Sequence, residues 1–396
     1  AAGMAEVLLY LAWLERYDIT LTLPPTYNQV EPADVITVNA EEGQYSLRIT
    51  SATYTPDGRI ECQAKYNSVA TYTSTAVGVA GSVTGQTLSE TGQTAYVVLD
   101  IPTIIDTTDT PGVVVAMAGY MSGWNGSTLY KSDDAGQIWT DLQGISAPGS
   151  NLGLCGLLAS GRTDIIDAAN VLNVSMIEGT LSSVSELSML NGANWFAVGD
   201  HGRWEIVAAK TCTLQGDGTY NVSDFLRGRY GTEWAMSLHQ SGDWFVQLDG
   251  ASSAFVNYPL SSIGVPHYYR GITNGQSFDS DSDRIQAYTG VCLECLSPVY
   301  LNGNRHPSTN DWTLTWVRRT RIGGEWRDLV DASLSEASET YVIEIYSSGT
   351  YATLKRTLTA TSQTVAYTSA DQVTDFGSNQ ATLYLKIYQV SANVGP

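Results

Sequence analysis

Residues 226–234 read Leu-Arg-Gly-Arg-Tyr-Gly-Thr-Glu-Trp, and the run Gly-Asp-Trp-Phe-Val-Gln-Leu follows at residues 242–248. Two glycines bracket an Arg-Tyr pair, which predicts a tight turn of one specific shape. Arginine and tryptophan are preferred anchors where two elements or two chains meet. The segment is therefore either an ordinary structural corner or an assembly loop. The side chains that we expect at such an interface are Arg227, Arg229, Glu233 and Trp234.

The composition predicts several folded domains that are mainly β-structure. A length of 396 residues suits two to four domains, and 43% hydrophobic residues, with 10% aromatic, are enough for packed cores. Tyrosine, threonine, serine, valine and glycine dominate while lysine is scarce, which favours strands and turns over helices. The net charge of −20 argues against direct nucleic-acid binding and against an anionic membrane as a partner of the bulk surface.

The first residues predict a helix. Between residues 4 and 17, apolar residues recur at helical spacing, so we expect an amphipathic helix of about four turns. The core of a signal peptide is the alternative, but no basic segment precedes it. Because the sequence opens without an initiator methionine, we expect it to be a segment of a longer polypeptide.

Alternating strands and turn residues after the helix predict a small β-barrel or β-sandwich, and its pattern recurs later in the chain. Asp57-Gly58 gives the strongest hairpin signal. Val38, Gly43, Tyr45, Leu47 and Asp57-Gly58 recur in order as Val198, Gly202, Trp204, Ile206 and Asp217-Gly218. The offset is about 160 residues, which predicts a duplicated barrel, with a chance likeness of hairpins as the alternative.

The same signals divide the chain into seven segments. Residues 68–95 are rich in serine, threonine, glycine and valine, so they form either an extended arm on a neighbouring subunit or a linker. The predicted segments are 1–24, a helix and lead-in; 25–67, a first barrel; 68–95, the arm; 96–190, a β-rich domain; 191–250, a second barrel; 251–308, a connecting region; and 309–396, a two-sheet sandwich.

Residues 132–139 carry the Asp-box pattern Ser-x-Asp-x-Gly-x-x-Trp, formed by Ser132, Asp134, Gly136 and Trp139. The hydroxyl and carboxylate are expected to bond the turn backbone, the glycine to permit the turn, and the indole to pack beneath it. Sialidase-like propellers repeat this box and add an arginine cluster. One box alone therefore predicts a stapled hairpin.

No familiar catalytic motif is present. The chain has four histidines and lacks a nucleophile elbow, an HExxH helix and a phosphate-binding loop. Asp200-His201 and the pair of Glu233 and His239 are the acid–base candidates, but a lone histidine beside a glycine is usually a turn residue. We expect no enzymatic activity, no catalytic residue and no cofactor.

Two clusters admit either a metal site or a structural role. The lone CxxC of Cys292 and Cys295 lacks two further ligands, so both cysteines are expected to be small apolar residues in a strand. Asp279, Asp281 and Asp283 alternate as in a calcium loop, but the glycine and terminal glutamate of an EF-hand are missing. We expect no metal site, and the odd count of five cysteines predicts no disulfide framework.

Residues 226–234 resemble the LLRGRRGTE signature of the tail-tip or baseplate hub proteins of long-tailed phages and gene transfer agents. Tyr230 stands where a second arginine is expected, and Phe225 replaces one leucine. The resemblance runs from about residue 30 to the end, and residues 316–326 resemble the fibronectin-like domain of the same family. Further segments that resemble the family are 191–206, 268–276, 375–377 and 388–391.

The resemblance implies a structural protein of the virion, a homotrimeric hub that closes the tail tube at the tail tip. Its domains would be small β-barrels or sandwiches, with an N-terminal helix and a C-terminal fibronectin type III-like sandwich. Two barrels per chain would give a trimer six quasi-equivalent barrels. The implied partners are further copies of itself, a distal tail protein, a tape measure protein, a tail fibre or receptor-binding protein, and the host cell surface.

A basic cluster in the last segment is a further docking candidate. Arg318, Arg319 and Arg321, with Arg327, could bind an acidic neighbour or form a solvated strand edge. The Asp-box and aromatic residues such as Trp124 motivate an alternative function, a secreted protein that binds or processes glycans. An adhesin built on the fibronectin-like module is a third. Hydrolysis of sialosides or peptidoglycan would separate an enzyme from a structural protein.

Overall fold

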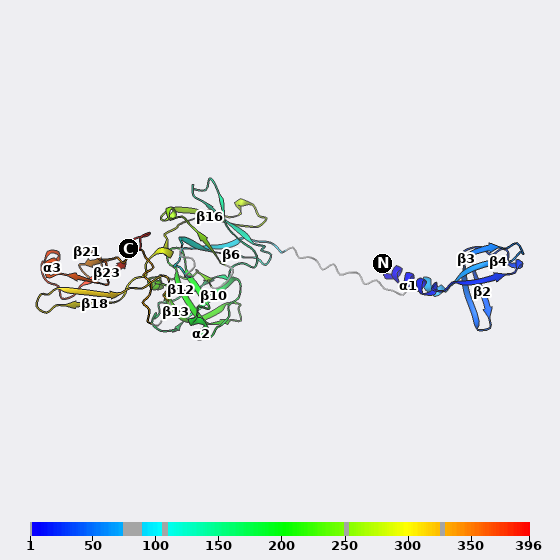
Figure 1. The fold of residues 1–396 in the computed structure, drawn as a ribbon, viewed down its shortest axis with the longest axis horizontal. Coiled ribbons are helices and arrows are strands. Elements are labelled where there is room, and N and C mark those ends of the chain that lie inside the picture. Colours follow the sequence, from blue (N-terminus) through cyan, green and yellow to red (C-terminus); the bar gives the residue numbers. More distant parts are fainter. Residues whose placement is uncertain (1, 74–88, 105–109, 249–252, 325–328) are drawn as a thin grey trace. The chain divides into compact units, whose positions relative to one another are not determined.

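A computed structural model describes residues 2–73, 89–104, 110–248, 253–324 and 329–396. The chain divides into two compact units, Ala1–Thr87 and Leu88–Pro396, which are described separately (Figure 1). Strands dominate both units, so the prediction of a mainly β fold is confirmed. Most of the predicted arm, residues 74–88, lies outside the described residues.

The N-terminal helix is present but is not amphipathic. It is α1 (Ala2–Leu14), shorter than predicted. Large apolar side chains occupy successive positions of this helix, so it has no polar face. Four of them are each more than half exposed: Met4, Leu8, Leu9 and Trp13. None of the helices in the described ranges is long and apolar enough to cross a membrane.

Within its described residues, the first unit forms an antiparallel sheet and not the small barrel predicted for residues 25–67. Its order is β1-β4-β3-β2, and β1 comes from the predicted lead-in. Inward side chains of the two central strands form the core, with Ile49 and Ile60 fully buried. The strands are β1 (Ile19–Leu23), β2 (Val35–Ala40), β3 (Gly43–Tyr54) and β4 (Ile60–Tyr66).

A middle domain in the second unit is built from segments far apart in the sequence. One sheet has the order β15-β6-β5 and another the order β17-β16-β7-β8. The predicted connecting region 251–308 is therefore wrong, because it supplies strands to both sheets. These strands are β5 (Thr94–Leu99), β6 (Gly112–Gly119), β7 (Ser127–Ser132), β8 (Thr140–Ile145), β15 (Ala254–Asn257), β16 (Pro266–Thr273) and β17 (Arg284–Ala287).

A closed barrel forms the centre of the second unit, in the order β10-β13-β12-β11-β14-β9. It starts at Leu152, so the boundary predicted at residue 191 is wrong. Its interior is apolar, and the rings of Phe196 and Phe245 lie 4.5 Å apart. The strands are β9 (Leu152–Cys155), β10 (Asp167–Glu178), β11 (Trp195–Gly199), β12 (Glu205–Leu214), β13 (Tyr220–Arg229) and β14 (Asp243–Gln247), and α2 (Glu186–Leu190) precedes β11.

Four strands of this barrel repeat the sheet of the first unit. The order β10-β13-β12-β11 matches β1-β4-β3-β2, with the same succession along the chain. The turns match as well: Thr55 N–H bonds Arg59 O at 2.9 Å, and Gln215 N–H bonds Thr219 O at 2.8 Å. Inward residues match at the offset of about 160 residues. These pairs are Ile36 and Phe196, Val38 and Val198, Leu47 and Val207, Ile49 and Ala209, and Ile60 and Tyr220.

The structure also corrects part of the predicted repeat. The sequence comparison paired Leu47 with Ile206 and Tyr45 with Trp204. However, Leu47 and Val207 face the interiors of their sheets, whereas Ile206 and Trp204 pack in a cluster on the outside of the barrel. The central part of the predicted match is therefore displaced by one residue, which moves a side chain to the other face of a strand.

The C-terminal domain is a sandwich of two three-stranded sheets, β18-β19-β22 and β21-β20-β23. Trp316 packs against Tyr341 in its core at 5.0 Å. The sandwich begins at Val299 and not at residue 309. Its elements are β18 (Val299–Arg305), β19 (Trp312–Val317), β20 (Tyr341–Tyr346), β21 (Leu354–Ala360), β22 (Thr364–Tyr367), α3 (Ser369–Phe376) and β23 (Tyr384–Gln389). Short 3-10 turns are η1 (Pro25–Tyr27), η2 (Val69–Tyr72), η4 (Glu233–Ser237), η5 (Leu260–Ser262), η6 (Phe278–Ser280) and η7 (Val291–Leu293).

The Asp-box forms the turn between β7 and β8. Ser132 Oγ donates to Asp134 Oδ1 at 2.7 Å, and the same oxygen accepts the N–H of Ile138 at 2.9 Å. Gly136 has a φ of +84°, and Trp139 Nε1 donates to its carbonyl at 3.0 Å. The polar groups of the box thus bond within the turn, as expected for a stapled hairpin.

Candidate functional site

The turn after β13 has a fixed and unusual backbone. Gly228, Tyr230 and Gly231 have φ values of +57°, +54° and +81°. A Cβ atom on Gly228 would lie 2.9 Å from the Cα of Glu233, so a larger residue does not fit without movement of the backbone. Tyr230 adopts the left-handed conformation while its ring packs edge-on against Trp195 at 5.3 Å. The turn therefore holds one shape, as the two glycines predicted.

Arg227 points into the barrel and is 1% exposed, so it is not an interface residue and this part of the prediction is wrong. Its Nε and Nη2 atoms bond the two carboxylate oxygens of Glu205, each at 2.8 Å. Its Nη1 atom reaches Asp167 Oδ2 at 3.1 Å and Ala159 O at 2.8 Å. The guanidinium thus ties β13 to β12 and β10 through buried charged groups.

Glu205 extends this cluster to a histidine and a second arginine. His239 Nε2 lies 2.6 Å from Glu205 Oε2, and its Nδ1 lies 3.4 Å from Asp243 Oδ2. Arg203 forms two hydrogen bonds with Asp243, at 2.7 and 2.6 Å. His239 therefore contacts Glu205 and Asp243 and not Glu233, its candidate acid–base partner. We call Asp167, Arg203, Glu205, Arg227, His239 and Asp243 the buried charge cluster.

The cluster holds its carboxylates in the charged form. Burial alone would raise the pKa of Glu205, but hydrogen bonds from His239 and Arg227 outweigh burial and lower that pKa below its ordinary value. Burial would likewise raise the pKa of Asp243, and the hydrogen bond from Arg203 is the main cause of its lowering. Apart from Arg203, the side chains of the cluster are at most 4% exposed, so the histidine and the carboxylates bond one another within the fold.

Four members of this cluster had no role predicted from the sequence: Asp167, Arg203, Glu205 and Asp243. A signal was present, because Glu205 stands inside the apolar run 204–209 and Asp243 precedes another apolar run. A charged residue within a buried strand requires a partner. The identity of each partner depends on strand pairing, which residue spacing does not give.

Most predicted interface residues line one cleft between the barrel and the C-terminal sandwich. The cleft has a volume of about 990 Å³. It brings together Arg229, Glu233, Arg318, Arg319 and Arg321. Arg227 lies in the core, while Trp234 lines a neighbouring pocket and is 53% exposed.

Two arginines of the predicted basic cluster are paired inside the C-terminal domain. Arg318 Nη2 bonds Asp331 Oδ2 at 2.9 Å, and Arg321 Nε bonds Glu336 Oε1 at 3.1 Å. Arg327 lies outside the described residues. The cluster is therefore not a patch of unpaired positive charge among the residues that the structure describes.

Arg319 joins the sandwich to the turn of the barrel. Its Nη1 atom lies 2.5 Å from Glu233 Oε1, and its Nε donates to Ser297 O at 2.7 Å. The acidic group that Arg319 contacts thus lies in the same chain. Glu233 is consequently occupied, which leaves Arg229 and Trp234 as the exposed members of the predicted interface.

This ion pair gives a measurable coupling. In a double-mutant cycle of Arg319→Ala and Glu233→Ala, we expect a coupling energy of about 0.5–1 kcal/mol in the free energy of unfolding, since both side chains are partly solvated. Urea denaturation of the four proteins measures it. Additive effects of the two substitutions would show that the pair does not stabilise the junction.

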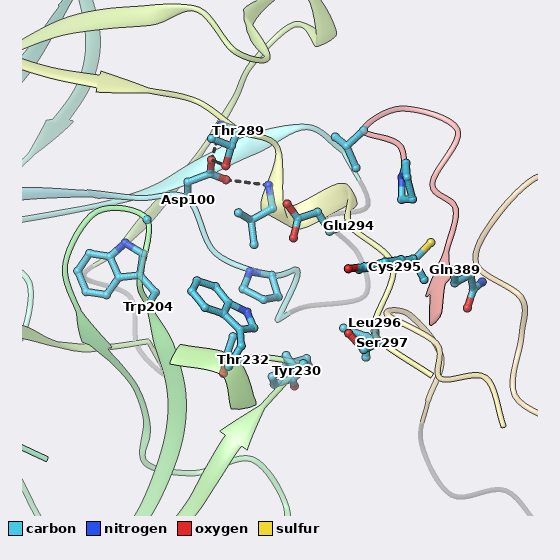
Figure 2. Close-up of a pocket in the computed structure, with 18 of the residues that line it drawn as sticks. Asp100, Trp204, Tyr230, Thr232, Thr289, Glu294, Cys295, Leu296, Ser297 and Gln389 are labelled. Carbon is cyan, nitrogen blue, oxygen red and sulfur yellow. Dashed lines mark hydrogen bonds between the residues drawn. The ribbon is translucent and has the colours of Figure 1, made fainter. Parts of the chain in front are cut away.

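A second cavity of about 480 Å³ lies beside this junction (Figure 2). Tyr230 and Glu294 are among its lining residues. Partial burial, followed by the nearby charge of Asp100, raises the pKa of Glu294. Asp100 itself accepts three backbone N–H groups, including that of Thr289 at 2.6 Å, so its carboxylate is used to hold the wall of the cavity.

The two candidate metal clusters make contacts within the chain. Cys292 lies in the 3-10 turn η7 and not in a strand, and burial raises the pKa of its thiol. Burial, with Glu336 nearby, raises the pKa of Cys295 to about 12. In the acidic loop, Arg270 donates to Asp283 Oδ1 at 2.6 Å and to Asp279 Oδ1 at 3.3 Å. Two of the three aspartates are therefore paired with an arginine. The described ranges contain no group of three or more His, Cys, Asp or Glu side chains placed to hold a metal ion.

Residues 1–52 match a family described as putative phage tail protein, and residues 154–246 match one described as Rcc01698-like, C-terminal. No curated protein matches. A crystal structure of chicken CNTN1 FN1-FN3 domains is similar at 8% identity over 76% of this chain and 94% of that chain, but its TM-score of 0.17 carries no argument about the fold. The family matches support a phage-tail-like protein and suggest a component of a virion tail.

Proposed function

We propose that the chain is the central hub of a phage-like tail tip, a homotrimer that closes the tail tube. The observation that carries this proposal is the repeated sheet, β1-β4-β3-β2 and β10-β13-β12-β11, within one chain. Three chains with two such units each would present six similar elements around one axis, which suits a tube of sixfold symmetry. The match of residues 1–52 to a phage tail family supports the same role.

The proposed role is mechanical and needs no catalytic residue. The hub would bind a distal tail protein above, a tape measure protein inside and a fibre or receptor-binding protein through its C-terminal sandwich, near the host surface. The second candidate, a glycan-binding protein, gains nothing from the Asp-box, because its Ser132 and Asp134 groups bond within their own turn.

The solution mass of the purified chain tests the proposal most directly. Light scattering after size exclusion is expected to give three times the 42.7 kDa of one chain. Quantitative mass spectrometry of tail particles should give three copies of the protein per tail. A chain that is monomeric at all concentrations and absent from particles would overturn the proposal.

Arg229→Ala is expected to lower incorporation of the protein into tail tips by on the order of tenfold, the effect of removing one interface anchor. The side chain is exposed, so the variant should fold normally. Arg162→Ala is the matched control, since Arg162 is an exposed arginine that pairs locally with Asp164. Normal incorporation of the Arg229→Ala protein would remove this turn from the interface.

A further inference from the structure

The cavity of about 480 Å³ beside the junction holds a carboxylate without a partner. Glu294 follows the turn η7 and lines this cavity. Its carboxylate has neither a hydrogen bond nor an ion pair with any residue that the structure describes. Two carboxylates nearby are occupied: Asp100 accepts backbone N–H groups, and Glu336 pairs with Arg321. Of these three acidic groups, Glu294 is the one that remains available to another molecule.

The surroundings of Glu294 oppose its negative charge. The side chain is exposed to solvent, yet partial burial by the surrounding protein raises the pKa of its carboxyl group. The charge of Asp100 is the second cause of the raised pKa, and no cation among the described residues acts against it. No described lysine or arginine lines the cavity. A positive charge supplied by a ligand would offset both effects.

Aromatic rings form another part of the wall. Trp234 lies in the 3-10 turn η4 and is more than half exposed, and Tyr230 lies in the turn before it. Figure 2 shows Glu294, Trp204 and Tyr230 on three different sides of the cavity. The face of an aromatic ring attracts a cation, and that of tryptophan does so most strongly. A carboxylate combined with such rings suits an ammonium or guanidinium group on an apolar stem.

We propose that this cavity binds an organic cation, an ammonium or guanidinium group carried on a flexible aliphatic chain. Glu294 supplies the ion pair, while Trp234 and Tyr230 supply apolar and cation–π contacts. The volume of about 480 Å³ falls within the roughly 300–1,000 Å³ of small-ligand sites, so a lysine or arginine side chain or a short diamine fits. The formal net charge of −20 favours the approach of such a cation.

Other classes of ligand fit the cavity less well. An anion would add to the repulsion between Glu294 and Asp100. A divalent metal ion would need several protein ligands, and the described residues contain no group of three or more His, Cys, Asp or Glu side chains placed to hold one. A neutral apolar ligand would exclude water from the carboxylate without giving it a partner. The side chains present therefore favour an organic cation.

Ligand-observed NMR titration of the purified full polypeptide tests the proposal. N-acetyl-lysine methylamide and N-acetyl-arginine methylamide carry the cation as a protein does, cadaverine is a free amine, and N-acetyl-norleucine methylamide is the neutral control. We expect at least one cationic probe to bind in the millimolar range or more tightly, as is usual for ligands of this size. The neutral control should bind about tenfold more weakly than that probe, the effect of losing one charge-assisted hydrogen bond.

The three cationic probes also identify the source of the cation. Binding of the acetylated probes without cadaverine would assign the site to a basic side chain of another protein. Binding of cadaverine alone would assign it to a free amine, and binding of both kinds would identify the cation itself as the recognised group. A crystal structure with the bound probe should place its cation within hydrogen-bond distance of the Glu294 carboxylate.

Glu294→Gln removes the charge and keeps the shape of the side chain, so it should lower the affinity for the cationic probe about tenfold. Because burial and Asp100 oppose the ionised carboxyl group, this variant should be at least as stable as the unmodified protein near neutral pH. Glu42→Gln is the matched control and should leave the affinity unchanged, since Glu42 is exposed in the first unit and does not line the cavity. Trp234→Leu should lower the affinity about threefold through the lost cation–π contact.

Other results would overturn the proposal. Equal affinities for the lysine and norleucine probes would show that the cavity selects apolar surface and not charge. Equal affinities of the unmodified and Glu294→Gln proteins would place the cation at another site, and a less stable Glu294→Gln protein would show that the carboxylate serves the fold. Absence of binding by every cationic probe would show that water or a segment of the same polypeptide fills the cavity. All these measurements use the purified protein, so their failure leaves the proposed function in the tail untouched.

Discussion

Replacing Arg227 by methionine is expected to lower the free energy of unfolding by about 3–5 kcal/mol, the usual effect of removing one partner from a buried ion pair. Methionine fills similar space but leaves Glu205 and Asp167 without the guanidinium that bonds both of them. These carboxylates have 0% and 4% side-chain exposure, so water cannot replace the lost hydrogen bonds. Urea denaturation monitored by tryptophan fluorescence measures the change.

Two variants show whether the geometry of the arginine matters. Arg227→Lys keeps the positive charge but loses the paired hydrogen bonds to Glu205, so it should recover only part of the lost stability. Arg229→Ala, two residues along the same turn, removes an exposed arginine and should change stability by less than about 0.5 kcal/mol. Equal stability of the Arg227→Met and Arg229→Ala proteins would show that the buried cluster does not hold the barrel together.

Local features of the fold were predictable from the sequence, whereas long-range pairings were not. The hairpin at Asp57-Gly58, its repeat at Asp217-Gly218 and the Asp-box turn depend on neighbouring residues and are found where they were predicted. The barrel boundary was wrong because β9 and β10 pair with strands that follow tens of residues later. Residue periodicity describes which face of a strand is apolar, but it does not say which other strand lies beside it.

The side chains of the candidate site were also predicted only in part, because their orientation depends on strand pairing. The sequence predicted both Arg227 and Arg229 as interface residues, because residue type alone does not distinguish two arginines in one turn. The pairing of β12 with β13 has a bulge between Ile206 and Ala208. The register of this pairing determines which residues of the turn point inward. The result is one arginine in the core and one in solvent. An indication was available in Glu205, an acidic residue within an apolar strand, which requires a buried cation nearby.

The buried charge cluster is also expected to make the barrel sensitive to acid. Asp167, Glu205 and Asp243 have pKa values lowered below those of ordinary carboxyl groups. A group whose pKa is lower in the folded state stabilises the fold fully above its unfolded pKa, which is about 4, and this contribution is lost as the pH falls through the folded pKa. The contribution of the cluster to stability should therefore be constant near neutral pH and fall steeply below about pH 4. If more than one proton binds on unfolding, the slope exceeds about 1.4 kcal/mol per pH unit.

Comparison of two carboxylate variants assigns this slope to the cluster. Glu205→Gln removes a buried titrating group that faces Arg227 and His239, so the variant should be less stable at pH 7 and lose stability less steeply in acid. Asp217→Asn removes a carboxylate whose pKa is also lowered, mainly by the backbone N–H of Thr219, but which lies in an exposed turn. The slope of its pH dependence should change less than that of Glu205→Gln, because solvent screens the charge of Asp217. Parallel pH dependences for the unmodified and Glu205→Gln proteins would show that acid unfolding starts elsewhere in the chain, and the cluster would then hold the barrel without sensing pH.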